Sequence, residues 1–171
     1  MARWAAGVVG LLLSGCTTTE AHHVPVRIEV AVDAPRLPEY VDGANAWHEL
    51  GYFASYEASG LPECADVRDG LAGAECEVVL YVGRARVVEI YGARGITARD
   101  DYGRRVSLLD VRYEGLELVA LAAHELGHSL LDTGEHADDP DAVMFRASWN
   151  WMVQRADREL ACRTVGAGCA E

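Results

Sequence analysis

The chain has 171 residues, half of them apolar and a quarter charged, which is the composition of one globular domain of ordinary size. Its formal net charge is −12, and all fifteen basic residues are arginine. The absence of a basic run or of a stripe of basic and aromatic residues argues against a nucleic-acid partner, and the acidity predicts a solvated surface and a monomer.

The start of the chain predicts a segment that is not part of the folded domain. Arg3 precedes a short apolar run, which is typical of a secretory signal peptide and shorter than a permanent transmembrane helix requires. A Leu-Ser-Gly-Cys sequence that ends at Cys16 then resembles a bacterial lipobox, in which the cysteine carries the lipid and becomes the new N-terminus. We expect a signal peptide over 1–15, a lipidated cysteine with a polar tether over 16–23, and one domain over 24–171. An ordinary cleaved signal with a chance cysteine is the alternative.

The predicted elements before the central motif are mainly strands. Alternation of apolar and polar residues indicates strands with one buried face, and a nearly all-apolar run indicates a central strand. We expect strands at 24–32, 52–56, 77–82, 87–91, 95–99 and 105–109, a helix at 40–50, and a loop rich in Gly and Asp at 61–75.

Four cysteines remain in the predicted domain. An even number of cysteines in an exported chain predicts disulfides, and three pairings are possible. The local pairing, Cys64 with Cys76 and Cys162 with Cys169, closes two short loops and is the one we favour. A structural zinc site is the alternative, but no Cys-x-x-Cys pair supports it.

The stretch 116–123 is rich in good helix formers and runs directly into the sequence His-Glu-Leu-Gly-His. Helical positions four apart lie on one face, so His124 and His128 can offer imidazole nitrogens to one ion. Zinc binds such nitrogens and, in catalytic sites, keeps a position open for water. Glu125 lies beside the first ligand, where it can take a proton from that water. The motif therefore predicts one catalytic Zn²⁺, with a chance occurrence on an ordinary helix as the alternative.

From this motif onward the sequence resembles the metzincin metalloproteases, and most closely their matrixin-like branch. That family has a third histidine after the motif, then a short loop and a methionine turn beneath the metal. Here His136 is followed by a loop that contains Asp-Pro and, eight residues later, by Met144. The resemblance covers 115–150 strongly and the rest by the order of elements. It implies that His136 is the third zinc ligand and that Met144 packs under the metal without binding it.

The loop before the third histidine departs from the family pattern. The family places glycine three residues after the second histidine and the third histidine three residues later. This chain has Leu131 and Gly134 at those places, and its histidine comes two residues late. We interpret Gly134 as the displaced helix end, because glycine is the usual residue there. Asp132 is a rival third ligand, or a hydrogen-bonding partner of a ligand, since it continues the spacing of four residues.

The resemblance also implies the architecture. It implies an α+β (α/β-like) zincin fold with a twisted mixed sheet, three helices and a cleft below the sheet. Independently of the resemblance, the helical spacing of apolar residues predicts a last helix over 147–163, with Trp149 and Met152 on its packed face. An edge strand within 96–109 would bind a peptide in extended form, and the wall of the side-chain pocket would lie at 145–147.

Together these features predict a zinc-dependent endopeptidase that hydrolyses peptide or protein substrates with Glu125 as general base. The lipobox implies attachment to a lipid membrane of the bacterial envelope, and Thr17 after the cysteine favours the outer membrane or the cell surface. The main alternative is a catalytically inactive zinc-binding lipoprotein that serves as a binding or structural module. A second alternative is a gluzincin, with Glu159 as the third ligand.

Overall fold

The computed structural model describes residues 24–30, 36–56, 60–64, 76–167 and 169. The expected signal peptide, Cys16 and the tether to residue 23 lie outside the described residues. Most of the predicted loop at 61–75 also lies outside them.

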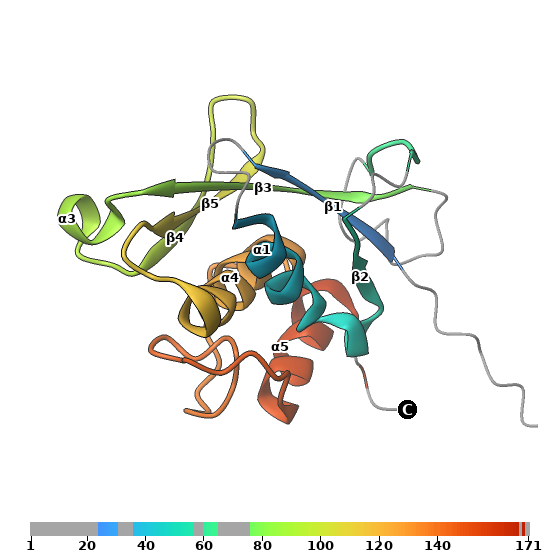
Figure 1. Ribbon diagram of the computed structural model, residues 1–171. Helices are drawn as coiled ribbons and strands as arrows, with labels where there is room; N and C mark the ends of the chain where they lie inside the picture. The colour runs from blue at the N-terminus through green and yellow to red at the C-terminus, as the bar shows by residue number, and fades with distance from the viewer. Residues whose placement is uncertain (1–23, 31–35, 57–59, 65–75, 168, 170–171) are drawn as a thin grey trace, which may run out of the picture.

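A five-stranded sheet forms the upper layer of the molecule (Figure 1). The strand order is β2-β1-β3-β5-β4, and every neighbouring pair is parallel except β4 and β5, which form an antiparallel hairpin. The apolar run at 77–82 falls in the central strand, as predicted, and the strands predicted at 95–99 and 105–109 are also confirmed. The strands are β1 (Val24–Val30), β2 (Tyr52–Ala54), β3 (Val78–Ala85), β4 (Gly95–Arg99) and β5 (Arg105–Asp110).

Four α-helices accompany the sheet in the described part of the chain, one more than the sequence predicts. They are α1 (Leu37–Asn45), α3 (Val87–Tyr91), α4 (Gly115–Leu130) and α5 (Arg155–Val165), and a 3₁₀ turn, η2 (His48–Leu50), follows α1. Figure 1 shows α1 and α4 together beneath the sheet, with α5 beyond them. The chain is therefore mixed α+β, with α4 between the sheet and the lower segments.

The prediction of a strand at 87–91 is wrong, because this segment is the short helix α3. Asp110 accepts a hydrogen bond from the Val88 backbone N–H at 2.7 Å, which stabilises the first turn. Gly92 ends the helix in a left-handed conformation with a φ of 68°. A five-residue apolar run has the same pattern in a short helix and in a strand, so periodicity alone does not separate them.

The predicted bounds of the first and last helices also need correction. The first helix begins at Leu37 rather than residue 40, because Pro38 suits its first turn, and η2 replaces its expected end. The last helix begins at Arg155 rather than residue 147, so the side chains of Trp149 and Met152, expected on its packed face, are exposed. Hydrogen bonds between Gln154 and the first turn of α5 fix this later start.

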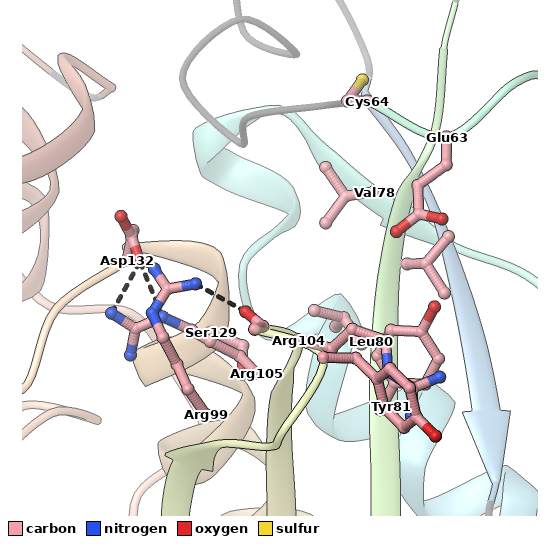
Figure 2. A pocket seen from close by; sticks show the side chains of 13 residues that line it. Glu63, Cys64, Val78, Leu80, Tyr81, Arg99, Arg104, Arg105, Ser129 and Asp132 are labelled. Atoms are coloured by element: carbon pink, nitrogen blue, oxygen red, sulfur yellow. Dashed lines mark hydrogen bonds and ion pairs between the residues drawn. The ribbon is translucent and has the colours of Figure 1, made fainter.

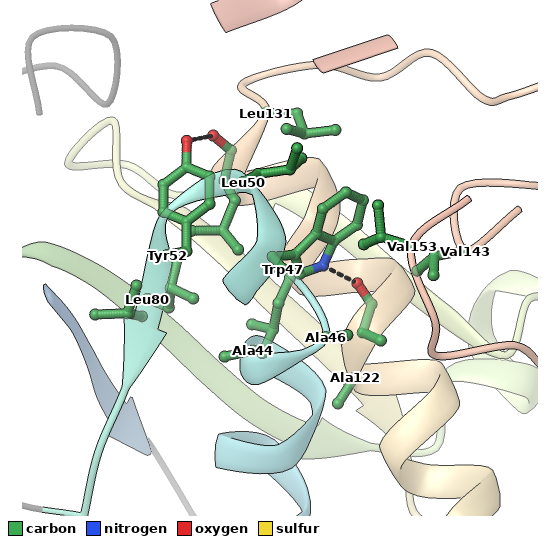
Figure 3. Packing of buried hydrophobic residues seen from close by; sticks show 14 of the residues in the cluster. Ala44, Ala46, Trp47, Leu50, Tyr52, Leu80, Ala122, Leu131, Val143 and Val153 are labelled. Atoms are coloured by element: carbon green, nitrogen blue, oxygen red, sulfur yellow. Dashed lines mark hydrogen bonds between the residues drawn. The ribbon is translucent and has the colours of Figure 1, made fainter. Parts of the chain in front are cut away.

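The central helix α4 is held by contacts with buried aromatic side chains (Figure 3). The indole N–H of Trp47 donates to the Ala123 carbonyl at 2.9 Å, and the Tyr52 hydroxyl donates to the Leu130 carbonyl at 3.0 Å. Gly43 lets α1 approach closely, since a Cβ there would lie 2.6 Å from the Ala122 Cβ. These contacts fix the helix that carries the histidine motif.

Two disulfides join Cys64 to Cys76 and Cys162 to Cys169, which confirms the predicted local pairing. Disulfides persist in oxidising compartments, so the pairs indicate an exported chain. Within the described residues, no helix has the length and apolar character needed to cross a membrane.

Candidate metal centre

Three histidines converge below the sheet. His124 and His128 lie on α4, and His136 comes from the loop that follows the helix. One potential ligand atom from each ring lies within 4.8 Å of those of the other two. The ring centroids form a nearly regular triangle, with separations of 5.0, 5.3 and 4.9 Å. This arrangement could hold one metal ion.

Backbone carbonyls orient the two helical imidazoles. The Nδ1 atom of His124 lies 2.7 Å from the Val143 carbonyl oxygen, and that of His128 lies 3.0 Å from the Thr133 carbonyl oxygen. A ring that donates its Nδ1–H to a carbonyl keeps the lone pair of Nε2 for a metal, so these contacts select the tautomer that binds. Both carbonyls belong to the segment after α4, which is thereby tied to the site.

Burial keeps the imidazoles in the neutral form that a metal requires. It lowers the pKa of His124 to about 4 and that of His128 to about 3. Burial also lowers the pKa of His136, with a further contribution from the positive charge of Arg146. All three rings are therefore neutral at pH 7 and fit a cation such as Zn²⁺.

The end of α4 differs from the expectation. Gly134 does not have a positive φ, and the left-handed residue is Asp132, with a φ of 43°. The Thr133 N–H donates to the His128 carbonyl and the Asp132 N–H to the Ser129 carbonyl, which together form a Schellman motif. Aspartate tolerates this conformation better than most residues, so the helix ends two residues before the position we predicted for its glycine.

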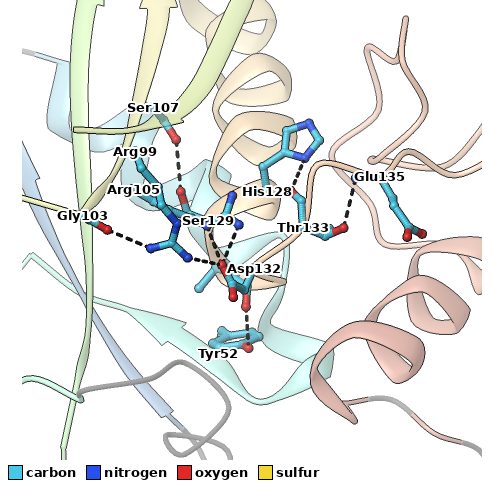
Figure 4. A network of polar contacts seen from close by, with 11 residues as sticks. Tyr52, Arg99, Gly103, Arg105, Ser107, His128, Ser129, Asp132, Thr133 and Glu135 are labelled. Carbon is cyan, nitrogen blue, oxygen red and sulfur yellow. Dashed lines mark hydrogen bonds and ion pairs between the residues drawn. The ribbon is translucent and has the colours of Figure 1, made fainter. Parts of the chain in front are cut away.

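Asp132 is not brought into the histidine triangle. Its carboxylate accepts hydrogen bonds from Arg99 at 3.0 Å and from Arg105 at 2.6 Å, both on the β4–β5 hairpin (Figure 4). Figure 2 shows these ion pairs at a separate cavity of about 330 Å³, which none of the three histidines lines. The carboxylate thus joins the end of α4 to the sheet, and its assignment as a rival third ligand is not supported by this geometry.

Glu125 lies next to the triad and against β4. Its side chain accepts a hydrogen bond from the Thr97 hydroxyl at 2.9 Å, and a Cβ at Gly95 would lie only 2.6 Å from its Oε1 atom. Burial raises the pKa of Glu125 to about 7, although Thr97 and the charge of Arg94 partly oppose the shift. A carboxylate with a pKa near neutrality can both accept and release a proton.

Met144 is fully buried beneath the triad helix. Gly127 makes room for it, because a Cβ at that position would lie 2.5 Å from the Met144 Sδ atom and 2.4 Å from the Trp47 ring. The methionine and its neighbour Val143, which contacts His124, belong to one turn.

A buried carboxylate that the sequence analysis did not single out holds this turn. Asp157 of α5 accepts hydrogen bonds from the backbone N–H groups of Val143 at 2.9 Å, Met144 at 2.8 Å and Gln154 at 2.8 Å. Burial raises its pKa, and the three N–H donors oppose the rise. The signal available in the sequence was an acidic residue three positions after a helix N-cap.

We expect Asp157→Ala to lower the free energy of unfolding by about 3–5 kcal/mol, because two buried N–H groups of the methionine turn lose their acceptor. Urea denaturation followed by circular dichroism measures the change. The control is Glu159→Ala on the same helix, since Glu159 is exposed and its ion pair within the described residues is with the exposed Arg155. That substitution should cost less than about 1 kcal/mol. Equal losses in the two variants would contradict the role of Asp157.

A cleft of about 610 Å³ opens beside the triad, between β4 and the loop after the methionine turn. Its lining includes Gly95, Ile96 and Thr97 on one side and His136, Arg146 and Ala147 on the other. The expected edge strand and pocket wall are thus both brought to the cleft, whereas Glu159 is not among the residues that line it. Comparison with protein-family models and with curated protein sequences finds no match to this chain.

Proposed function

We propose that the protein is a zinc-dependent endopeptidase of the metzincin type. The observation that carries the proposal is the convergence of three neutral imidazoles with Glu125 at one open cleft. Three histidines are the ligand set of a catalytic zinc with an open coordination position. A purely structural zinc site has no use for an adjacent buried carboxylate.

The donor set fits Zn²⁺, which would be held by His124, His128 and His136. When bound there, zinc supplies Lewis-acid chemistry that polarises a peptide carbonyl and acidifies a water molecule. Glu125 accepts a proton from the attacking water and later delivers it to the leaving amine, a cycle for which a pKa near neutrality is suited. The Thr97 hydroxyl holds the carboxylate of Glu125 in place.

The outer edge of β4 is the proposed binding surface for the peptide backbone. Among the described residues, β4 is the last strand of the sheet, so one row of its N–H and C=O groups has no neighbouring strand there. An extended peptide can add to such an edge, with its scissile bond beside the triad. Met144, which is fully buried, would pack beneath the metal without binding it.

Peptide cleavage tests the proposal. The purified domain from residue 24 onward, loaded with zinc, should cut members of a broad peptide library. A chelator should stop the reaction and added zinc should restore it. Tight zinc binding without cleavage of any peptide would favour the non-catalytic zinc-binding module instead.

We also propose a lipid anchor at Cys16, on the lipobox sequence alone. In bacterial cells, Cys16→Ser should release the protein from the membrane fraction or block its processing. The measurement is fractionation together with mass spectrometry of the mature N-terminus. An unmodified N-terminus in the wild-type protein would overturn the proposal.

A further inference from the structure

Two arginines reach the catalytic cleft from separate segments of the chain. Arg94 directly precedes the edge strand β4, and Arg146 follows Met144 by two residues. Both line the cleft that contains the three histidines and Glu125. The positive charge of Arg94 opposes the rise in the pKa of Glu125, and the positive charge of Arg146 lowers the pKa of His136. Each guanidinium therefore lies near a residue of the site.

Neither guanidinium forms an ion pair with a carboxylate in the described part of the chain. Arg99 and Arg105, further along the same hairpin, share Asp132 instead. Arg94 stacks on the Trp149 ring, with its Cζ atom 4.2 Å from the ring centroid. Stacking fixes the plane of the guanidinium and leaves the N–H groups at its edge available to a ligand.

The cleft therefore has the opposite charge from the rest of the protein. The chain has a net charge of −12, yet Glu125 is the sole carboxylate among the described residues that line the cleft. A bound zinc ion would add further positive charge. A peptide carboxylate that enters this cleft meets two guanidinium groups that pair with no carboxylate of the described residues. Guanidinium groups bind carboxylates through paired hydrogen bonds.

We propose that the preferred substrates are acidic peptides, with an aspartate or glutamate within two residues of the scissile bond. Arg146 and Arg94 are the residues that select this charge. The proposal deepens the proposed peptidase function and rests on it for the position of the scissile bond.

The test uses the purified full chain and three peptides that differ only at one position beside the cleaved bond, which carries Glu, Gln or Lys. Wild-type kcat/KM should be about ten-fold or more higher for the Glu peptide than for the Gln peptide, and lowest for the Lys peptide. The preference should weaken as salt is added, because part of the attraction is screened.

Charge reversal identifies the residues that select the peptide. Arg146→Glu should prefer the Lys peptide over the Glu peptide, and Arg94→Glu should shift the preference in the same direction. The matched control is Arg163→Glu on α5, outside the cleft, which should keep the wild-type order. Because Arg146 is exposed, its replacement should leave the fold intact, which circular dichroism checks.

Binding separates failure of this inference from failure of the peptidase proposal. Fluorescence anisotropy of the labelled peptides with the Glu125→Ala variant measures the charge preference without cleavage. Equal kcat/KM for the three peptides would overturn the acidic preference and leave the peptidase intact. If nothing is cut, tighter binding of the Glu peptide supports the charge selection without the peptidase, whereas equal or absent binding overturns both.

Discussion

Glu125→Gln should lower peptide cleavage by about 10²–10⁴-fold and leave zinc affinity nearly unchanged. Glutamine has almost the same shape and can still contact the Thr97 hydroxyl, which lies 2.9 Å from the carboxylate in the wild type. It cannot accept the proton of the attacking water, so the loss appears in kcat. The measurements are steady-state kinetics and a zinc titration on the same preparation.

The control is Glu117→Gln, which removes a carboxylate from the exposed first turn of the same helix α4. This variant should match the wild type in both measurements. Two results would contradict the assignment of Glu125: cleavage that persists in Glu125→Gln, or a loss of zinc that accounts for the loss of cleavage.

His136→Ala should lower zinc affinity by orders of magnitude, because it leaves His124 and His128 as the two remaining protein ligands. Asp132→Ala should lower it by no more than about 10–100-fold. Asp132 pairs with Arg99 and Arg105, so its loss affects the loop before His136 rather than the metal directly. Competition with a chelator of known affinity measures both variants.

A further variant separates the two roles of Asp132. Asp132→Gly keeps the left-handed conformation at no steric cost but removes the ion pairs, whereas Asp132→Ala removes the ion pairs and adds strain. Zinc affinity should therefore be higher in the glycine variant than in the alanine variant. If Asp132→Gly loses zinc while His136→Ala retains it, the carboxylate is a ligand and the assignment of His136 is wrong.

Much of the site was predictable because its residues follow from local geometry. Spacing by four residues puts His124 and His128 on one face of any helix, and the apolar run before them predicts that helix. The spacing of eight residues between His136 and Met144 resembles the metzincin pattern, and that resemblance predicted His136 as the third histidine of the site. The strands β3 and β5 were predictable from the pattern of apolar residues along the chain.

The remaining features depend on contacts between distant segments. The sequence alone does not show that Asp132 pairs with the β4–β5 hairpin, because these residues are about thirty positions apart. For the same reason it does not show that Asp157 binds the methionine turn. The segment before α5 has helical spacing of apolar residues, yet α5 begins only at Arg155. The hydrogen bond from the Gln154 N–H to the Asp157 carboxylate sets this start.

A crystal structure of the zinc-loaded protein, with diffraction data collected on both sides of the zinc absorption edge, would test whether the three histidines bind zinc. The difference between the two data sets locates the zinc without reference to the protein atoms. We expect one zinc ion bound by His124, His128 and His136 at about 2.0–2.1 Å, with an open position facing Glu125. A zinc ion bound by Asp132 in place of His136, or no zinc at the three histidines, would contradict this expectation.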